Sequence, residues 1–434
     1  MKLVKMSLAT AVLLGASAFA IDNVKVSGDA QLFYGTNSAG AATTASGIEP
    51  AVGGNGGDLF SKGNSAADTA VRLGVTGDLL KGVSFGVTGY AVSTLGLENN
   101  LVSNVWSGAH GATANNSSAG AQVDDASWIG EAWLAATAGK TTVKAGRMAL
   151  DTPLAYSETW SITPNTFEGA VLINQDIPDT TVVGAWIGNG NGVNTIGYAN
   201  LSVGVDGIVG SGGDFQTFLS DGAYAAAVIN NSLKPLVVQA WYYNVSNIAN
   251  AYWLQADWDC QLIKDVKIGV QYADMDTKGL LDTFNDSSAY AVKLGYEGIK
   301  DLKLYAAYSD VTKDGLLKVA NVATGNLSIA QSKLYTEGYM NYGYVGSEGA
   351  ETYAAGATYN AGVATLGAQY MNSNGTLNSS FDTIGEHDVT EVTLTATKSF
   401  GPLDTTVAYY STDADDQNDG KRYDSILAML KLNF

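Results

Sequence analysis

Charged side chains of both signs gather in one stretch of the chain, residues 146–169. This stretch holds Arg147, Asp151, Glu158 and Glu168. The guanidinium fork of an arginine can bind a carboxylate through two hydrogen bonds, so Arg147 could clamp one of its acidic neighbours. Carboxylates without such a partner could instead attract cations. The sequence contains no Gly-x-Ser-x-Gly, His-Glu-x-x-His or phosphate-binding pattern, so these charges are not predicted to be catalytic.

A second acidic group lies near the C-terminus, between residues 413 and 420. Asp415, Asp416 and Asp419 supply carboxylates, which are good calcium ligands. An EF-hand loop would close with a bidentate glutamate, but Ile426 occupies that place. We therefore expect a solvated acidic loop and no bound cofactor, with calcium binding as the alternative.

Short stretches of alternating apolar and polar residues recur along the chain and must position these charges. In one of them, Tyr290, Val292 and Leu294 alternate with Lys293 and Gly295. A period of two places alternate side chains on opposite faces of a β-strand. Comparable stretches occur near residues 24–34, 71–76, 83–88, 266–272, 302–309, 353–359, 364–370 and 392–396. Tyrosine at the ends of several apolar faces is typical of the aromatic belt at a bilayer surface.

Connections between these stretches alternate in length. Short turns are predicted near 80–82, 139–140, 175–179, 232–235, 261–264, 298–301, 360–362 and 400–402. The other connections are predicted at 36–66, 94–124, 149–164, 190–220, 246–250, 275–286, 311–348, 372–386 and 413–421. This pattern predicts about eighteen strands, with both termini on the turn side. An open sheet edge cannot survive in hydrocarbon, so we expect an all-β fold, a closed transmembrane antiparallel up-and-down β-barrel around an aqueous channel.

The two ends of the chain support export to an outer membrane. Residues 1–20 combine Lys2 and Lys5 with an apolar stretch and small residues, which predicts a cleaved secretory signal peptide. Residues 21–434 would then form one barrel domain, whose last alternating strand ends in Phe434. Without the signal, 21 Lys and Arg face 42 Asp and Glu, a net charge of about −21. This charge disfavours nucleic acid as a partner and is compatible with attraction of cations.

The same alternation predicts which charged residues face the interior. If the apolar set contacts lipid, the charged side chains on the other face line the channel. They are Lys25, Asp29, Arg72, Glu131, Glu168, Asp257, Lys267, Lys293, Lys303 and Glu391. Opposite charges across a pore create a field that orients solutes and sets ion preference. The alternative is that most are simply solvated or hold a loop in place. Between Val143 and Met148 neither face is cleanly apolar.

The sequence GRMALDTPL at 146–154, followed by TPNTFEG at 163–169, resembles a segment of the OprD-type outer membrane porins. Relatives of that family include the major porins of the Campylobacter group. The resemblance implies that residues 149–165 belong to a third loop, which folds into the barrel and narrows it. Arg147, Asp151, Glu158 and Glu168 are then candidates for lining the constriction.

One feature departs from the pattern of this family. OprD-type porins carry a ladder of Arg and Lys that draws in carboxylate solutes, whereas this chain has arginine only at 72, 147 and 422. We therefore predict a bacterial outer-membrane porin for passive diffusion of small hydrophilic solutes through a cation-preferring channel. Its expected partners are lipid, lipopolysaccharide, and small solutes and cations. The resemblance also implies a homotrimer, with outward-facing alanines at 355, 357, 364 and 368 as possible contacts.

Three alternatives to a general porin remain at this stage. The first is a substrate-specific channel of the same architecture, with a binding site at the constriction. The second is an outer-membrane hydrolase, which would have to use one of the two histidines, His110 or His387, both expected in or beside outer loops. The third is a secreted adhesin of β-solenoid turns, which would need a fixed short repeat.

Overall fold

The computed structural model describes residues 21–40, 58–97, 101–102, 104–105, 125–159, 162–192, 213–217, 222–321, 330–379 and 382–434. The predicted signal peptide and His110 lie outside these residues. Within them, no helix is long and apolar enough to cross a bilayer. The helices with defined bounds are short 3-10 turns, η1 (Lys62–Asn64), η3 (Gly279–Leu281), η4 (Tyr342–Tyr344) and η5 (Asn418–Gly420).

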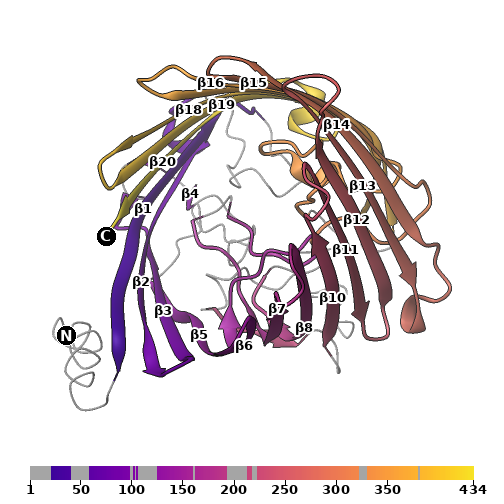
Figure 1. The fold of residues 1–434 in the computed structure, drawn as a ribbon. Coiled ribbons are helices and arrows are strands. Elements are labelled where there is room, and N and C mark those ends of the chain that lie inside the picture. The colour runs from indigo at the N-terminus through magenta and orange to yellow at the C-terminus, as the bar shows by residue number, and fades with distance from the viewer. Residues whose placement is uncertain are drawn as a thin grey trace.

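The described chain forms one β-sheet, in which β4 (Asn104–Val105) and β9 (Gln216–Thr217) are two-residue additions. The other strands, eighteen in all, are β1 (Asp22–Asn37), β2 (Ser65–Leu80), β3 (Val83–Ser93), β5 (Ala126–Ala138), β6 (Thr141–Met148), β7 (Phe167–Asn174), β8 (Thr180–Gly190), β10 (Ala223–Asn230), β11 (Leu236–Val245), β12 (Ala249–Asp259), β13 (Val266–Thr277), β14 (Ser287–Ile299), β15 (Leu302–Val311), β16 (Glu351–Asn360), β17 (Thr365–Ser379), β18 (Asp382–Phe400), β19 (Leu403–Ala414) and β20 (Tyr423–Asn433). Each pairs antiparallel with the next, and β20 pairs with β1, so the sheet closes into a barrel (Figure 1). The predicted fold is confirmed.

The closing seam joins the two ends of the described chain. Its register runs from Asp29 opposite Asn433 to Asn37 opposite Ser425. Beyond it, Gly28 and Phe434 exchange two backbone hydrogen bonds of 2.8 and 2.9 Å. A Cβ on Gly28 would lie 2.8 Å from the Phe434 ring, so only glycine lets the terminal ring pack over β1 at this point. The seam leaves no unpaired edge in the sheet, as hydrocarbon requires.

The outer face of the wall is apolar and ends in tyrosines. Val292 and Leu294 on β14 are exposed on this face, whereas Lys293 points inward. Tyr290, Tyr308 and Tyr353 lie side by side on adjacent strands, with ring centroids 6.0 and 5.0 Å apart. Their outer ends meet carboxylates, because the Tyr353 hydroxyl donates a 2.6 Å hydrogen bond to Glu351 on the same strand. This row marks the outer limit of the lipid-facing band.

The connections agree with the predicted turns, and two of the longer ones differ from expectation. The predicted loop at 372–386 is mostly strand, because β17 and β18 remain paired out to Ser379 opposite Asp382. Polar strands can extend beyond the bilayer while their backbone groups stay hydrogen-bonded to one another. The second difference concerns residues 312–321 and 330–350, which the sequence predicts in an outer loop and which instead lie inside the barrel.

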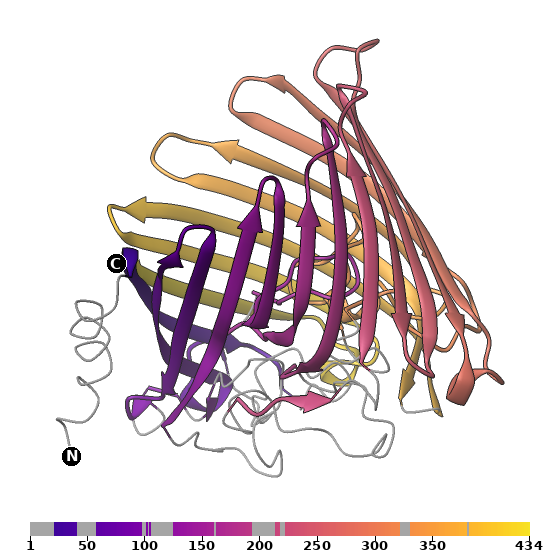
Figure 2. The ribbon, with the colours of Figure 1, turned by 60° about the horizontal axis from the view of Figure 1, so that its bottom comes forward.

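Two segments enter the interior between β6 and β7 and between β15 and β16 (Figures 1 and 2). Their described residues are 149–159 with 162–166, and 312–321 with 330–350, and they are called the segments 149–166 and 312–350 below. They bury apolar side chains against the inner wall, in a cluster that joins Leu154 and Val319 to Trp253 of β12. The wall at this place is lined by small residues, which leave room for the segments. These are Ala223, Ala225, Ala227, Ala249, Ala251, Ala273, Ala289 and Ala291. The apolar residues of 312–350 explain why this segment is not solvated outside.

We predict that a spin label at Val292 or Leu294 will be quenched by dissolved oxygen and protected from polar quenchers. The reason is that both side chains stand on the lipid face, 45% and 56% exposed. A label at Lys293 is the matched control, since it should show the opposite preference. Polar accessibility at 292 and 294 would contradict the assigned faces of β14.

Candidate channel constriction

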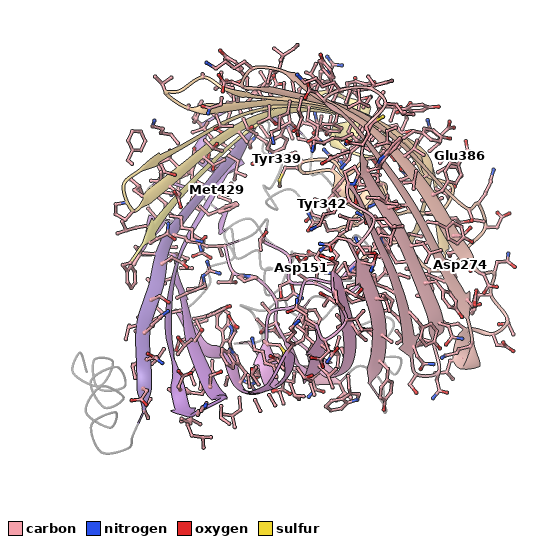
Figure 3. The ribbon with its side chains drawn as sticks, viewed as in Figure 1. Asp151, Asp274, Tyr339, Tyr342, Glu386 and Met429 are labelled. Atoms are coloured by element: carbon pink, nitrogen blue, oxygen red, sulfur yellow. The ribbon has the colours of Figure 1, made fainter. Side chains whose placement is uncertain are left out.

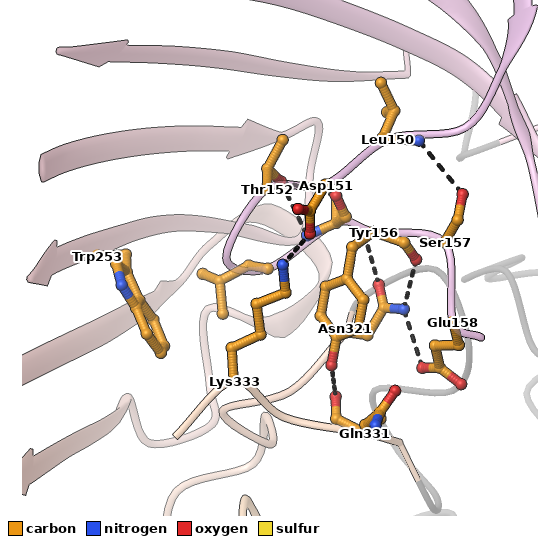
Figure 4. A network of polar contacts seen from close by, with 12 residues as sticks. Leu150, Asp151, Thr152, Tyr156, Ser157, Glu158, Trp253, Asn321, Gln331 and Lys333 are labelled. Carbon is orange, nitrogen blue, oxygen red and sulfur yellow. Dashed lines mark hydrogen bonds and ion pairs between the residues drawn. The ribbon is translucent and has the colours of Figure 1, made fainter. Parts of the chain in front are cut away.

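The two inner segments are joined by a network around Tyr156 and Asn321 (Figure 4). The Asn321 side chain accepts a hydrogen bond from the Tyr156 amide at 3.2 Å and donates to the Tyr156 carbonyl at 2.8 Å. It also donates to the Glu158 carboxylate at 2.9 Å. The Tyr156 hydroxyl donates to the Gln331 carbonyl at 2.6 Å. The segments therefore form one unit across a sequence separation of more than 150 residues.

Tyr156 is buried at the centre of this unit. Burial raises the pKa of its hydroxyl well above the ordinary value, and the negative charge of Glu158 acts in the same direction. The hydroxyl thus stays protonated and keeps its role as donor. The ammonium group of Lys333 lies 4.6 Å from the centre of the Tyr156 ring, a cation–π contact.

Asp151 is the predicted constriction residue that the structure places at the open interior. A tight turn presents it, because the Ser157 amide donates to the Leu150 carbonyl at 2.8 Å and Asp151 bridges to Tyr156. Its carboxylate forms an ion pair with Lys333, yet its side chain is 88% exposed. Figure 3 shows Asp151 inside the ring of strands, away from the wall.

Glu158 lies in the same segment but does not line the channel. Its side chain is buried and accepts the hydrogen bond from Asn321, while its amide donates to Asn165 Oδ1 at 2.8 Å. The prediction that Glu158 faces the constriction is therefore corrected: it holds the segment together from within.

Arg147 and Glu168 form a 2.6 Å ion pair between β6 and β7, and the Asn189 amide donates to Glu168 at 2.6 Å. The next residues, Met148 and Phe167, form the adjacent cross-strand pair and are buried. Phe167 packs with residues of the inner segment, so the alternation assigns Arg147 and Glu168 to the outward side. This placement corrects the prediction that the pair narrows the channel. The pair braces two strands instead.

The remaining charges predicted to face inward fall into three groups. Midway along β1 and β2, Arg72 binds Asp29 at 2.8 Å, and Lys25 lies on the same strand face as Asp29, nearer the turn. The same group includes Glu131 on the inner face of β5, opposite Thr88. Near the turns, Lys267 pairs with Asp259 at 2.7 Å, and both Lys267 and Lys303 approach Glu297.

The third group contacts the segment 312–350 directly. Asp257 accepts a 2.7 Å hydrogen bond from the Tyr335 hydroxyl, and the Lys293 ammonium lies 4.0 Å from the Tyr335 ring. Glu391 is almost fully buried beneath the segment, where it accepts hydrogen bonds from three backbone amides. Glu391 is thus on the predicted face of β18 but does not meet the water of the channel.

Sequence reasoning missed several residues of this site. Asn321, Gln331, Lys333 and Tyr335 belong to the segment that the sequence predicts in an outer loop, so the sequence does not indicate them as site residues. Lys144, 4.2 Å from the Trp133 ring on the inner face of β5, was also missed. The sequence signal that this segment needs burial is the cluster of Leu316, Leu317, Val319 and Ala320, which only Lys318 interrupts.

The acidic loop and His387 make contacts with neighbouring strands and with the segment 312–350. Asp415 accepts the Asp388 amide at 3.1 Å, and Asp416 accepts the Tyr344 hydroxyl. In the part of the chain that the structure describes, no three His, Cys, Asp or Glu side chains could hold a metal ion together. His387 is buried on the inner face of β18, 4.6 Å from the Tyr344 ring, rather than at the surface where it was expected.

Comparison with known proteins identifies the class. The profile of the OprD family of outer membrane porins matches residues 61–343, and the chain therefore belongs to this family. No curated protein sequence matches it. The fold is similar to OccK8 (OprE) of Pseudomonas aeruginosa, with a TM-score of 0.68 and 15% identity over 95% of this chain and 98% of that one.

Two further structures from Pseudomonas aeruginosa show the same fold. OpdK with vanillate has a TM-score of 0.67 and 12% identity, and OccK2 (OpdF) in complex with glucuronate has 0.65 and 15%. In both cases the alignment covers 95% of this chain and 98% of the other. The strand count inferred from the sequence agrees with this fold.

The outward placement of Glu168 has a testable consequence. We predict that Glu168→Gln leaves the reversal potential in a salt gradient unchanged, because the carboxylate lies outside the channel. The free energy of unfolding should fall by about 1 kcal/mol, since Arg147 loses its charged partner in an ion pair whose side chains are 36% and 30% exposed. A shift of the reversal potential toward anion selectivity would show that Glu168 lines the channel and would contradict its outward placement.

Proposed function

We propose that this OprD-family protein is a general porin, through which small hydrophilic solutes and ions diffuse passively with a preference for cations. The observation that carries this proposal is that each of its arginines forms an ion pair with a carboxylate. Arg72, Arg147 and Arg422 each lie within 3.2 Å of a carboxylate oxygen, of Asp29, Glu168 and Asp413 respectively. Because each arginine already pairs with a carboxylate of the protein, none has its full charge available to attract a carboxylate solute.

Among the inner lysines, Lys333 is also paired, with Asp151. Lys144, Lys293 and Lys333 lie over the rings of Trp133, Tyr335 and Tyr156. By contrast, Asp257 accepts hydrogen bonds from the neutral side chains of Gln255 and Tyr335, which leave its negative charge in place. Together with the excess of Asp and Glu over Lys and Arg in the whole chain, this arrangement supports a negative potential inside the channel.

A substrate-specific channel is the second candidate, and the similar structures favour it. OpdK was solved with vanillate and OccK2 with glucuronate, and both ligands are carboxylates. In this chain a carboxylate solute would meet Lys333 and Lys293 rather than an arginine ladder. Reduction of single-channel current by millimolar vanillate or glucuronate would separate this candidate from a general pore.

Export and assembly follow from the same proposal. Residues 1–20 would be removed as a signal peptide, and the apolar outer face would contact lipid and lipopolysaccharide. The small outward residues Ala355, Ala357 and Ala368 on β16 and β17 would allow close contact in a homotrimer. The mass of the detergent-solubilised protein tests the assembly.

Reconstitution in a planar bilayer with a salt gradient tests the function. We predict a reversal potential of cation-selective sign, reduced by Asp151→Asn and increased by Lys333→Gln, which frees the Asp151 carboxylate. One charge at 4 Å in water is worth about 1 kcal/mol, so the permeability ratio should change by at most roughly fivefold.

Asp282→Asn is the matched control, because this exposed carboxylate lies in the connection between β13 and β14. It should leave the reversal potential unchanged. Anion selectivity of the unmodified protein would contradict the preference, and absence of conductance would contradict the porin function.

A further inference from the structure

Glu391 makes an unusual set of contacts for a carboxylate predicted to line water. It stands on the inner face of β18 with 1% of its surface exposed. Its two oxygens accept hydrogen bonds from the consecutive amides of Tyr339, Met340 and Asn341 at 2.7, 2.9 and 2.8 Å. The Asn341 side-chain amide and the Thr393 hydroxyl donate as well, at 2.9 and 3.0 Å. Five donors thus converge on one buried charge.

Glu391 is the last of three wall side chains, with Gln271 and Gln369, that hydrogen-bond to the backbone of the segment between Lys333 and Asn341. We call these three side chains the belt. Gln271 of β13 accepts the Tyr335 amide at 3.0 Å and donates to the Lys333 carbonyl at 2.9 Å. Further along, Gln369 of β17 donates to the Glu337 carbonyl at 2.7 Å. Each of these neutral anchors holds one or two backbone groups. Glu391 holds three amides, and its hydrogen bonds are charge-assisted, so its contribution is the largest of the belt.

The anchored residues also reach the other inner segment. Met340 and Tyr342 belong to one buried cluster with Phe33 of β1, Tyr410 of β19 and Ile162 of the segment 149–166. Figure 3 shows Tyr339 and Tyr342 on the inner side of the wall. At its other end, the belt places Lys333 beside Asp151. A change in the docking of residues 339–341 therefore moves the groups that bound the opening.

We propose that Glu391 is a positioning residue, which docks the segment 312–350 against the wall and thereby sets the aperture, rather than a charge that acts on permeating ions. This inference rests on the proposed porin function. Two roles are distinguishable. The effect of a lining charge on permeating ions depends on its sign. The effect of a positioning carboxylate depends on the length of its side chain and on its capacity to accept hydrogen bonds from several amides at once.

Two variants separate these roles in single-channel recordings. Glu391→Gln keeps the shape but replaces one acceptor oxygen by an NH₂ group facing amide donors. Glu391→Asp keeps the charge but is one methylene shorter. We expect both variants to show larger conductance with discrete current steps, as the segment undocks. The undocked population should rise roughly tenfold, the factor that corresponds to about 1.4 kcal/mol.

Glu386→Gln is the matched control, because Glu386 is an exposed carboxylate on the same strand. It should give the current trace of the unmodified protein. If Glu391→Gln shifts only the reversal potential and Glu391→Asp changes nothing, Glu391 is a lining charge and the proposal is overturned. Such a result leaves the porin function itself intact, whereas loss of that function would appear as an unmodified protein that does not conduct.

A disulfide between the segment and the wall tests whether the current steps of Glu391→Gln arise from undocking of the segment. The hydroxyls of Ser309 on β15 and Thr336 in the segment lie 2.5 Å apart. Replacing both by cysteine, in a chain with Cys260→Ser, allows a disulfide that holds the segment to the wall. Oxidation should suppress the current steps of Glu391→Gln, and reductant should restore them. Steps that persist under a formed disulfide would show that they do not arise from undocking, and would overturn the proposal.

Discussion

The structure depends on one constraint: backbone amides and carbonyls in hydrocarbon must pair with each other. An unpaired group costs several kcal/mol there, so the sheet has to close on itself. Here β20 returns to β1, and Gly28 with Phe434 completes the seam at the turn side. The alternation of the strands follows from this closure, because a closed wall has one face for lipid and one for water.

Closure of the barrel also encloses a wide interior, which the two inner segments partly fill. Eighteen strands enclose more volume than their side chains fill, so the inside is a channel unless other chain segments occupy it. Alanines on β10–β14 leave space along one side of the wall, and the two inner segments pack there. Their union through Asn321 and Tyr156 leaves Asp151 and Lys333 at the opening. The proposed ion preference thus depends on tertiary contacts rather than on the strands alone.

The sequence predicted those features that depend on local periodicity. The strands, the turns and the inward direction of Lys293 and Asp257 follow from a period of two, and the structure agrees. The faces of Arg147 and Glu168 could not be predicted, because Gly146 has a positive φ of 124° and the register shifts beside Gly169. The entry of the segment 312–350 into the barrel could not be predicted either, because it depends on distant partners. One of them is Glu391, which lies 50 residues from Asn341 in the chain.

The most direct test of this account is a disulfide across the closing seam. Ala30 of β1 lies opposite Leu432 of β20 in the register. In a chain with Cys260→Ser, cysteines at 30 and 432 should cross-link readily in the membrane-inserted protein, and cysteines at 30 and 430 should not. Faster cross-linking of the staggered pair, or none in either, would contradict a barrel closed by its first and last strands.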